Sequence, residues 1–282
     1  MLDVRNRRLA ALPALALGLL LFAPSASSAG HGLGRMTVTP TRVLAGSAGN
    51  TLAFAYVADT RAFRGEMLVD VARGWSTPQT TSAMAPGYVR VAHGTCSNRT
   101  RLLRLVSRRL VIAVSCASGQ RFSLTYSNAT APTLSADGYV FVTQTKPAKA
   151  PKAKKRHKKR KLGFQPLAPE KQPVVVVVGN VVNHLVVSAT SVATVSTGFG
   201  LNIRAVDAYG NNASGYTGQV SFTSTDPRAT LPSPYRFVTT DGGGKTFPGT
   251  VLRTPGVQRI VARDDAGRVA VSNPITVYPT GG

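Results

Sequence analysis

The sequence predicts an all-β protein built of two β-sandwich modules. The clearest evidence is a stretch in the second half, where Phe199, Leu201, Ile203 and Ala205 alternate with smaller or polar residues. A period of two is typical of a strand with one buried face. The pattern breaks at 207–210, where Asp and Gly favour a turn, and resumes further on, so the stretch predicts strands linked by hairpins.

The first half shows the same alternation. Leu52, Phe54 and Tyr56 share one face of a predicted strand, and further alternating runs cover 110–116 and 122–126. Strands at intervals of about ten residues, separated by turn residues, predict a sandwich. The single tryptophan, Trp75, is expected to lie in the core or at its edge.

The second half carries motifs of a known family. These are D-A-Y-G-N at Asp207–Asn211, Y-x-G-x-V-x-F at Tyr216–Phe222, S-T-D-P at Ser224–Pro227 and T-P-G-V-Q-R-I at Thr254–Ile260. In this order they resemble the bacterial immunoglobulin-like (Ig-like) repeat of the invasin and intimin type, over roughly residues 183–278. Filamin-type repeats share much of the pattern. The resemblance implies an Ig-like sandwich that acts as a spacer or an adhesive module.

The first half resembles another bacterial Ig-like module more loosely. The residues that carry this resemblance are T-V-T-P-T at Thr37–Thr41, A-G-S-A-G-N-T-L at Ala45–Leu52, G-W-S-T-P-Q at Gly74–Gln79 and G-Q-R-F-S-L-T-Y at Gly119–Tyr126. It implies a second structural domain of the extracellular kind.

Residues 1–29 have the features of a secretory signal peptide. Three arginines precede an apolar stretch, Leu9–Ala23, and small residues before Gly30 suit cleavage. An uncleaved membrane anchor is the alternative, but the apolar stretch is shorter than the roughly 20 residues that span a bilayer. No second long apolar stretch follows, so no membrane span is expected after signal removal. We therefore expect a secreted or extracellular protein, associated with the cell wall or surface.

The two cysteines, Cys96 and Cys116, lie in the first module. Because an exported chain meets an oxidising environment, we expect them to form a disulfide. Closing a loop of about twenty residues stabilises the fold by roughly 3 kcal/mol. Two buried free thiols are the alternative.

The charge is strongly positive, at +23, and its densest part lies between the modules. Lys146–Lys161 holds ten Lys or Arg residues and no acid. Blocks of like charge stay extended, so residues 146–173 are expected to form a disordered basic linker. Val174–Val178 is then expected to start the second module as a strand that pairs near His184–Val187.

This basic run is the strongest functional signal. It suits phosphate-rich or acidic polymers, bound with steep salt dependence and little sequence preference. For an exported protein the expected partners are anionic cell-envelope polymers and acidic glycans. Nucleic acid binding would be non-specific, because almost no aromatic residues are interleaved. A merely solubilising spacer is the alternative. The candidate anion-binding residues of the run are Lys152, Lys154, Lys155, Arg156, Lys158, Lys159, Arg160 and Lys161.

A second basic cluster lies between the cysteines. If the strands at 102–105 and 110–114 pair, Ser107-Arg108-Arg109 forms the connecting turn and presents Arg108 and Arg109 to an anion. A solvated arginine-rich surface is the alternative reading of this cluster.

No catalytic, metal or cofactor motif emerges, so we expect no enzyme activity and no cofactor. The four histidines are scattered, and there is no G-x-S-x-G elbow. Gly242–Thr246 imitates the end of a phosphate-binding loop, but the first glycine of that motif is replaced by Thr239. Scattered aspartates such as Asp207 and Asp226 suit turns better than a calcium site, which needs several oxygen ligands at one place.

The predicted organisation is a signal peptide at 1–29, an Ig-like sandwich at 30–145, a basic linker at 146–173 and an invasin-type Ig-like domain at 174–282. The predicted function is a secreted or cell-surface structural or adhesive protein, tethered by its basic run. A specific partner, such as another surface protein, would contact loops at the sandwich ends. An extracellular nucleic-acid or acidic-glycan binder and a non-catalytic accessory module of an enzyme system are the alternatives.

Overall fold

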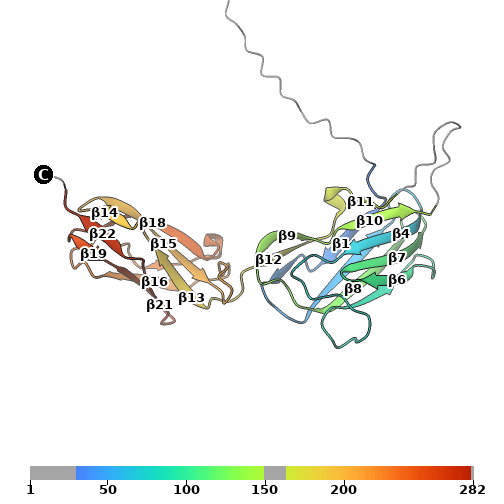
Figure 1. Cartoon of the computed structure of the whole chain (residues 1–282), viewed down its shortest axis with the longest axis horizontal. Helices are drawn as coiled ribbons and strands as arrows, with labels where there is room; N and C mark the ends of the chain where they lie inside the picture. The colour runs from blue at the N-terminus through green and yellow to red at the C-terminus, as the bar shows by residue number, and fades with distance from the viewer. Residues whose placement is uncertain (1–29, 149–162, 281–282) are drawn as a thin grey trace, which may run out of the picture. The chain divides into compact units, whose positions relative to one another are not determined.

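The computed structural model describes residues 30–148 and 163–280, and β-strands dominate this part of the chain (Figure 1). The described ranges contain no α-helix, only two short 3-10 helices, η1 (Pro169–Lys171) and η2 (Thr239–Asp241). The predicted fold class, all-β with two Ig-like sandwiches, is confirmed. Within the described ranges, no helix is long and apolar enough to cross a membrane. The predicted signal peptide and residues 149–162 of the basic run lie outside the described residues.

The first sandwich contains two main sheets and a smaller one. The first sheet has the order β1 (Arg35–Thr39), β3 (Asn50–Val57), β8 (Arg121–Ala129) and β5 (Tyr88–Ala92). The second sheet has the order β11 (Gln165–Pro166), β10 (Thr143–Pro147), β4 (Phe63–Asp70), β7 (Arg109–Cys116) and β6 (Arg101–Val106). The small sheet joins β2 (Arg42–Leu44), β12 (Val174–Val178) and β9 (Ala136–Val140).

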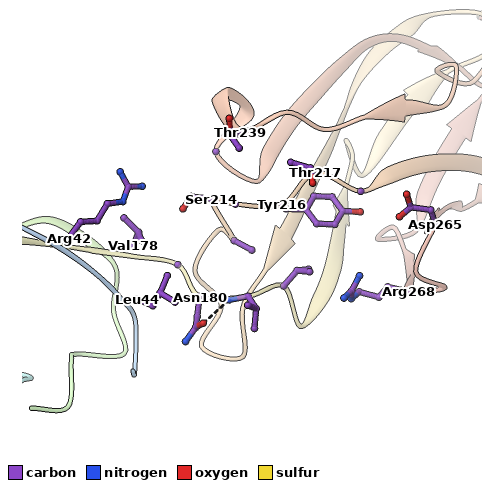
Figure 2. A pocket seen from close by; sticks show the side chains of 17 residues that line it. Arg42, Leu44, Val178, Asn180, Ser214, Tyr216, Thr217, Thr239, Asp265 and Arg268 are labelled. Carbon is purple, nitrogen blue, oxygen red and sulfur yellow. Dashed lines mark hydrogen bonds between the residues drawn. The ribbon is translucent and has the colours of Figure 1, made fainter. Parts of the chain in front are cut away.

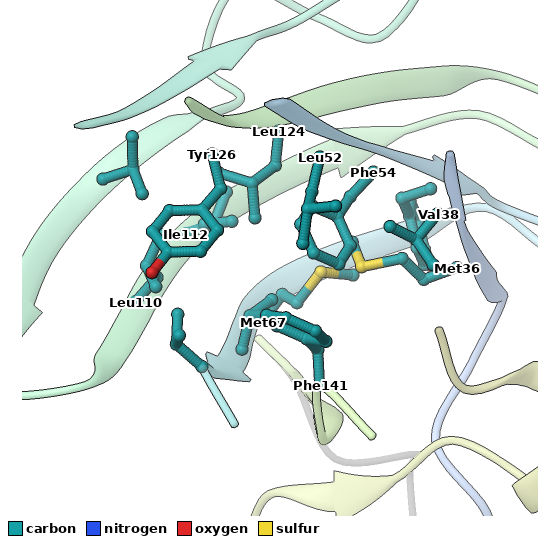
Figure 3. Packing of buried hydrophobic residues seen from close by; sticks show 14 of the residues in the cluster. Met36, Val38, Leu52, Phe54, Met67, Leu110, Ile112, Leu124, Tyr126 and Phe141 are labelled. Carbon is teal, nitrogen blue, oxygen red and sulfur yellow. The ribbon is translucent and has the colours of Figure 1, made fainter. Parts of the chain in front are cut away.

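The core of this sandwich is filled by the inward residues of the two main sheets. Phe54 and Phe141 pack with their ring centroids 4.9 Å apart, Met36 and Met67 lie beside them, and Ile112 belongs to the same core next to Tyr126 (Figure 3). Trp75 is also buried there, as predicted, with its ring 5.6 Å from that of Phe141. The alternation read from the sequence therefore identifies the residues that exclude water between the sheets.

Cys96 and Cys116 form the predicted disulfide. Both cysteines are buried in the first core, and the bond links the end of β7 to the loop that precedes β6.

The structure places the end of the first sandwich further along the chain than the sequence suggested. The strand predicted to open the second module, β12, pairs instead with β2 in parallel and with β9 in antiparallel register. Its inward residues Val175 and Val177 are fully buried in the first core, and Leu167 joins them. A run of five valines fits any buried strand position, so its sequence alone does not indicate which sandwich it completes.

The second sandwich consists of three sheets. One has the order β13 (His184–Ser188), β15 (Gly198–Val206) and β18 (Gly244–Val251). Another has the order β14 (Val192–Thr194), β22 (Ile275–Tyr278) and β19 (Gly256–Gln258). The last has the order β17 (Tyr235–Arg236), β16 (Gln219–Ser224), β20 (Ile260–Asp264) and β21 (Val269–Val271).

The strands predicted around the 199–222 motif are present, but they are not partners in a hairpin. β15 pairs with β13 and β18, whereas β16 pairs with β17 and β20 in a different sheet. Leu201, Ile203 and Val220 meet in the core from these separate sheets. The connecting segment 207–218 therefore crosses from one sheet to the other, as in Greek-key sandwiches.

Candidate binding surfaces

Several arginines lie on the outer face of the second sheet of the first sandwich, on β6 and β7. Along β7, Leu110, Ile112 and Val114 point into the core, so Arg109 and Val111 point outward. The neighbouring strand β6 places Arg101 opposite Ala113 and Arg104 opposite Val111. Both arginines therefore share the outward face of β7, because directly opposed residues of an antiparallel pair lie on the same face.

The predicted turn between β6 and β7 is present, and it separates the two arginines that the sequence grouped together. Ser107 has a φ of 54°, and Arg108 follows it at the turn. The Arg108 guanidinium donates from Nε to the Val71 carbonyl at 3.0 Å, and from Nη2 to the carbonyls of Ala72 at 2.6 Å and Trp75 at 2.9 Å. Arg108 thus holds the loop that follows β4.

Arg109 lies on the outer face and pairs with a carboxylate. Its Nε donates to Oδ1 of Asp70 at 2.8 Å, across the β4–β7 pair. Lys146 makes a similar contact with Glu66, with Nζ 3.5 Å from Oε2. These pairs are exposed, so each contributes at most about 1 kcal/mol to stability.

The other predicted anion-binding residues, Lys152 to Lys161, lie outside the described residues. The described residues on either side belong to one sandwich. Thr145 of β10 and Gln165 of β11 are direct partners in antiparallel register. Beside this pair, Lys146 lies over the ring of Phe164 at 5.5 Å from its centroid. The basic run therefore falls between two paired strands of the first sandwich in the sequence, whereas its composition predicted a linker between the two modules.

The D-A-Y-G-N motif of the second sandwich builds a buried polar cluster around Asp207. Oδ1 of Asp207 accepts from the backbone N–H of Tyr209 and of Asn211, both at 2.9 Å, and Oδ2 accepts from that of Asn180 at 2.9 Å. Burial alone would raise the pKa of Asp207, but these bonds and one from the Asn211 side chain outweigh it and lower the pKa. The aspartate remains ionised as the centre of the turn.

Two asparagines of this cluster also contact the first sandwich. Nδ2 of Asn211 donates to the Thr133 carbonyl at 2.7 Å, and its Oδ1 accepts from the Ser135 N–H at 2.9 Å. Nδ2 of Asn180 donates to the Ala45 carbonyl at 2.9 Å. The sequence identified this motif as a turn, whereas the structure adds these contacts to it.

A hollow of about 850 Å³ lies beside this cluster (Figure 2). Arg42 and Leu44 line it together with Asn180, Tyr216 and Arg268. The Tyr216 hydroxyl donates to Oδ2 of Asp264 at 3.1 Å, and Arg268 Nη1 donates to the same oxygen at 2.9 Å. The charges of Arg268 and Asp264 therefore neutralise each other at this hollow.

Asp226 resembles Asp207 in being buried and fully bonded. Its oxygens accept from the Thr254 hydroxyl at 2.6 Å and from the backbone N–H of Arg228, Arg253 and Thr254. Burial would raise the pKa of Asp226, but the Thr254 hydroxyl and the three N–H groups outweigh it and lower the pKa to about 2. Asp226 therefore joins its own turn at Arg228 to the segment that follows β18, at Arg253 and Thr254.

No protein-family model matches the sequence, and no curated protein matches it. Solved structures similar in fold include the adhesin InvE of Yersinia pseudotuberculosis, at 12% identity and a TM-score of 0.27. The similarity covers 86% of this chain and 58% of InvE. The Escherichia coli adhesin FdeC is 15% identical with a TM-score of 0.30, over 89% of this chain and 65% of FdeC.

A C-terminal fragment of intimin, solved in complex with the intimin-binding domain of its translocated receptor, is also similar. It is 9% identical with a TM-score of 0.22, over 87% of this chain and 64% of the fragment. InvE and FdeC are described as adhesins, but the similar structures also include a major pilin of Streptococcus agalactiae and the ligand-binding domain of human OSCAR. The chain spans less than two thirds of the length of InvE, of FdeC and of the intimin fragment.

One basic residue of the outer face went unnoticed in the sequence. Arg64 of β4 lies opposite Ser115 of β7, on the face that also holds Arg101 and Arg104. In β4 the apolar residues Phe63, Met67 and Val69 point inward, but the inward position between Phe63 and Met67 is Gly65. The apolar alternation is therefore interrupted next to Arg64, and the sequence does not show that Arg64 points outward. Its place beside the other arginines depends on the β4–β7 pairing, which the sequence does not reveal.

Proposed function

We propose that this protein is a non-catalytic binding module of the extracellular surface, which attaches to anionic envelope polymers through its basic run. The observation that supports the proposal is the pairing of β10 with β11, because it assigns the described residues before and after the run to the same sandwich. Because the described residues on both sides of the run are paired strands of the first sandwich, the charge of the run belongs to that sandwich, and concentrated positive charge attracts anionic partners.

Two further features support an extracellular location. The Cys96–Cys116 disulfide persists in an oxidising compartment and is rare in reducing ones. Both sandwiches are of the Ig-like kind, and the solved structures similar in fold include two bacterial adhesins.

The binding is electrostatic in this proposal. Each lysine or arginine that neutralises an anionic group releases a condensed counterion, so affinity falls steeply with salt. For eight such contacts, affinity falls on the order of ten-thousandfold between about 0.05 and 0.2 M salt. Such binding tolerates many polymers, and it needs no preformed pocket.

The test is retention of the purified protein on isolated bacterial envelopes as salt is raised. In one variant, glutamine replaces the eight basic residues from Lys152 to Lys161. In the matched control, the same residues of the run are kept in scrambled order. We expect the neutralised variant to wash off at about 0.15 M salt and the scrambled control to stay bound. Equal retention of both variants would contradict the proposal, and stronger binding to DNA than to envelopes would favour the nucleic-acid alternative.

A further inference from the structure

The outer face of the β4–β7–β6 sheet holds a second group of basic side chains, separate from the basic run. Arg64 of β4 and Arg101 and Arg104 of β6 point outward on this face, at the levels of Ser115, Ala113 and Val111 of β7, and Arg109 follows at the end of that row. Arg101 and Arg104 face successive outward residues of β7, about 7 Å apart along the strand. We call these four arginines, together with the neighbouring Leu68 and Val111, the arginine face.

The three outer members of this face have no partner within the described ranges. The side chains of Arg64, Arg101 and Arg104 are exposed and make no hydrogen bond or ion pair with any described residue. The two carboxylates on the face, Asp70 and Glu66, are already paired with Arg109 and Lys146. The face therefore keeps an excess of positive charge that is free to meet an external anion.

The middle of the arginine face is apolar and partly covered. Val111 is only 4% exposed, yet it points away from the core and does not belong to the core cluster. Leu68 and Arg104 are its direct cross-strand neighbours. Long side chains such as arginine can bury apolar surface with their stems while their charged heads stay in water.

The face continues into a hollow at the β6–β7 turn. This hollow, of about 600 Å³, is lined by Arg73, Val106, Arg109 and Val142 among others. Val106 and Val142 are exposed there beside the two arginines. A bound chain that follows the arginine face can thus place an apolar ring face over the valines and its anionic groups at the arginines.

We propose that the arginine face is a binding site for an acidic polysaccharide. This inference deepens the proposed function by locating a second contact with the same class of polymer. A polysaccharide that bears regularly spaced carboxylates or sulfates offers the planar or tetrahedral anions that guanidinium groups bind with two hydrogen bonds. Its sugar rings present C–H faces to the apolar strip of Val111 and Leu68.

Nucleic acid fits this face less well. Proteins that bind single strands place aromatic rings against the bases, and the outward residues of β4, β7 and β6 include no aromatic side chain. The central strip of valine, leucine and alanine also leaves no polar group to read a base edge. DNA is therefore the competing ligand in the test.

The test uses the full chain with its basic run neutralised by glutamine, so that only the folded sandwiches contribute. In this background we compare the triple variant Arg64→Gln, Arg101→Gln, Arg104→Gln with a control of equal charge, Arg61→Gln, Arg90→Gln, Arg121→Gln. Arg90 and Arg121 lie on strands of the opposite sheet, and all three control residues are exposed. The probes are polygalacturonate for carboxylates, heparin for sulfates, and a DNA duplex.

The polysaccharide that the background protein binds more tightly is used for the comparison. At 0.05–0.1 M salt we expect the arginine-face variant to bind it at least about tenfold more weakly than the background protein does, because the loss of three contacts accounts for a factor of this order. The control should lose less than about twofold. Fluorescence of Trp75 on heating shows that both variants remain folded, since the substituted side chains are exposed.

Equal losses in the two triple variants would overturn the inference, because they would reveal only a response to net charge. Tighter binding of DNA than of either polysaccharide would overturn it as well. If the protein with the neutralised basic run binds neither polysaccharide even at low salt, the arginine face is not a binding site, whereas the proposed function of the basic run stands. If instead the run proves dispensable for envelope retention, the proposed function fails and the triple variants alone decide the role of the face.

Discussion

Replacing Arg108 with alanine should destabilise the first sandwich, although Arg108 lies in a basic cluster that the sequence assigned to anion binding. The side chain makes three hydrogen bonds of 3.0 Å or shorter to the carbonyls of Val71, Ala72 and Trp75. A hydrogen bond from a charged donor contributes about 1.5–3 kcal/mol. The three bonds share one partly exposed guanidinium, and water can hydrate the carbonyls that Arg108→Ala leaves free. We therefore expect Arg108→Ala to lower the free energy of unfolding by about 3 kcal/mol. Arg108→Lys should lower it by about half as much.

Urea unfolding followed by tryptophan fluorescence measures this loss. Trp75 is the only tryptophan and is buried in the first core, so its signal reports on that sandwich alone. Arg104→Ala is the matched control, because Arg104 is exposed and should cost less than about 0.5 kcal/mol. Similar midpoints for the two variants would refute the structural role of Arg108 and return it to the set of free anion-binding residues.

Three further predictions concern the cores and buried carboxylates. The folded-state pKa of Asp226 is lowered to about 2, so its ionised form stabilises the second sandwich above about pH 4. That contribution, about 2 kcal/mol, should disappear as the pH falls from 4 to 2, and an acid titration of Asp226→Asn should lack this step. Val177→Ala should lower the stability reported by Trp75 by about 2 kcal/mol, whereas an unchanged Trp75 transition would place β12 in the second module. Denatured but unreduced protein should show no reactive thiol, and Cys96→Ser with Cys116→Ser should cost about 3 kcal/mol, so two titratable thiols in the wild type would exclude the bridge.

The sequence indicated individual strands well, because one-sided burial leaves a period of two in the residues themselves. The pattern at 199–205 corresponds to β15, and the turn at Ser107 joins the predicted strands β6 and β7. The pairing of strands was harder to predict. β12 joins β2 in parallel across more than 130 residues, and nothing in a run of valines specifies such a distant partner.

For the candidate sites too, local features could be predicted and tertiary ones could not. The sequence shows that arginines cluster between the cysteines, because this is visible from their positions in the chain alone. It did not reveal that Arg108 reaches back to backbone carbonyls while Arg101 and Arg104 point outward. Their orientation follows from the register of β6 on β7 and from the loop after Val71, both of which are features of the tertiary fold.

The salt dependence of binding to one acidic polysaccharide tests the central claim most directly. The logarithm of the association constant should fall linearly with the logarithm of salt concentration, with a slope set by the number of cations engaged. We predict a steep slope for the full chain, a shallower one after neutralisation of the basic run, and the shallowest when the arginine face is also removed. A slope near zero, unchanged in all three proteins, would contradict an electrostatic role for this protein.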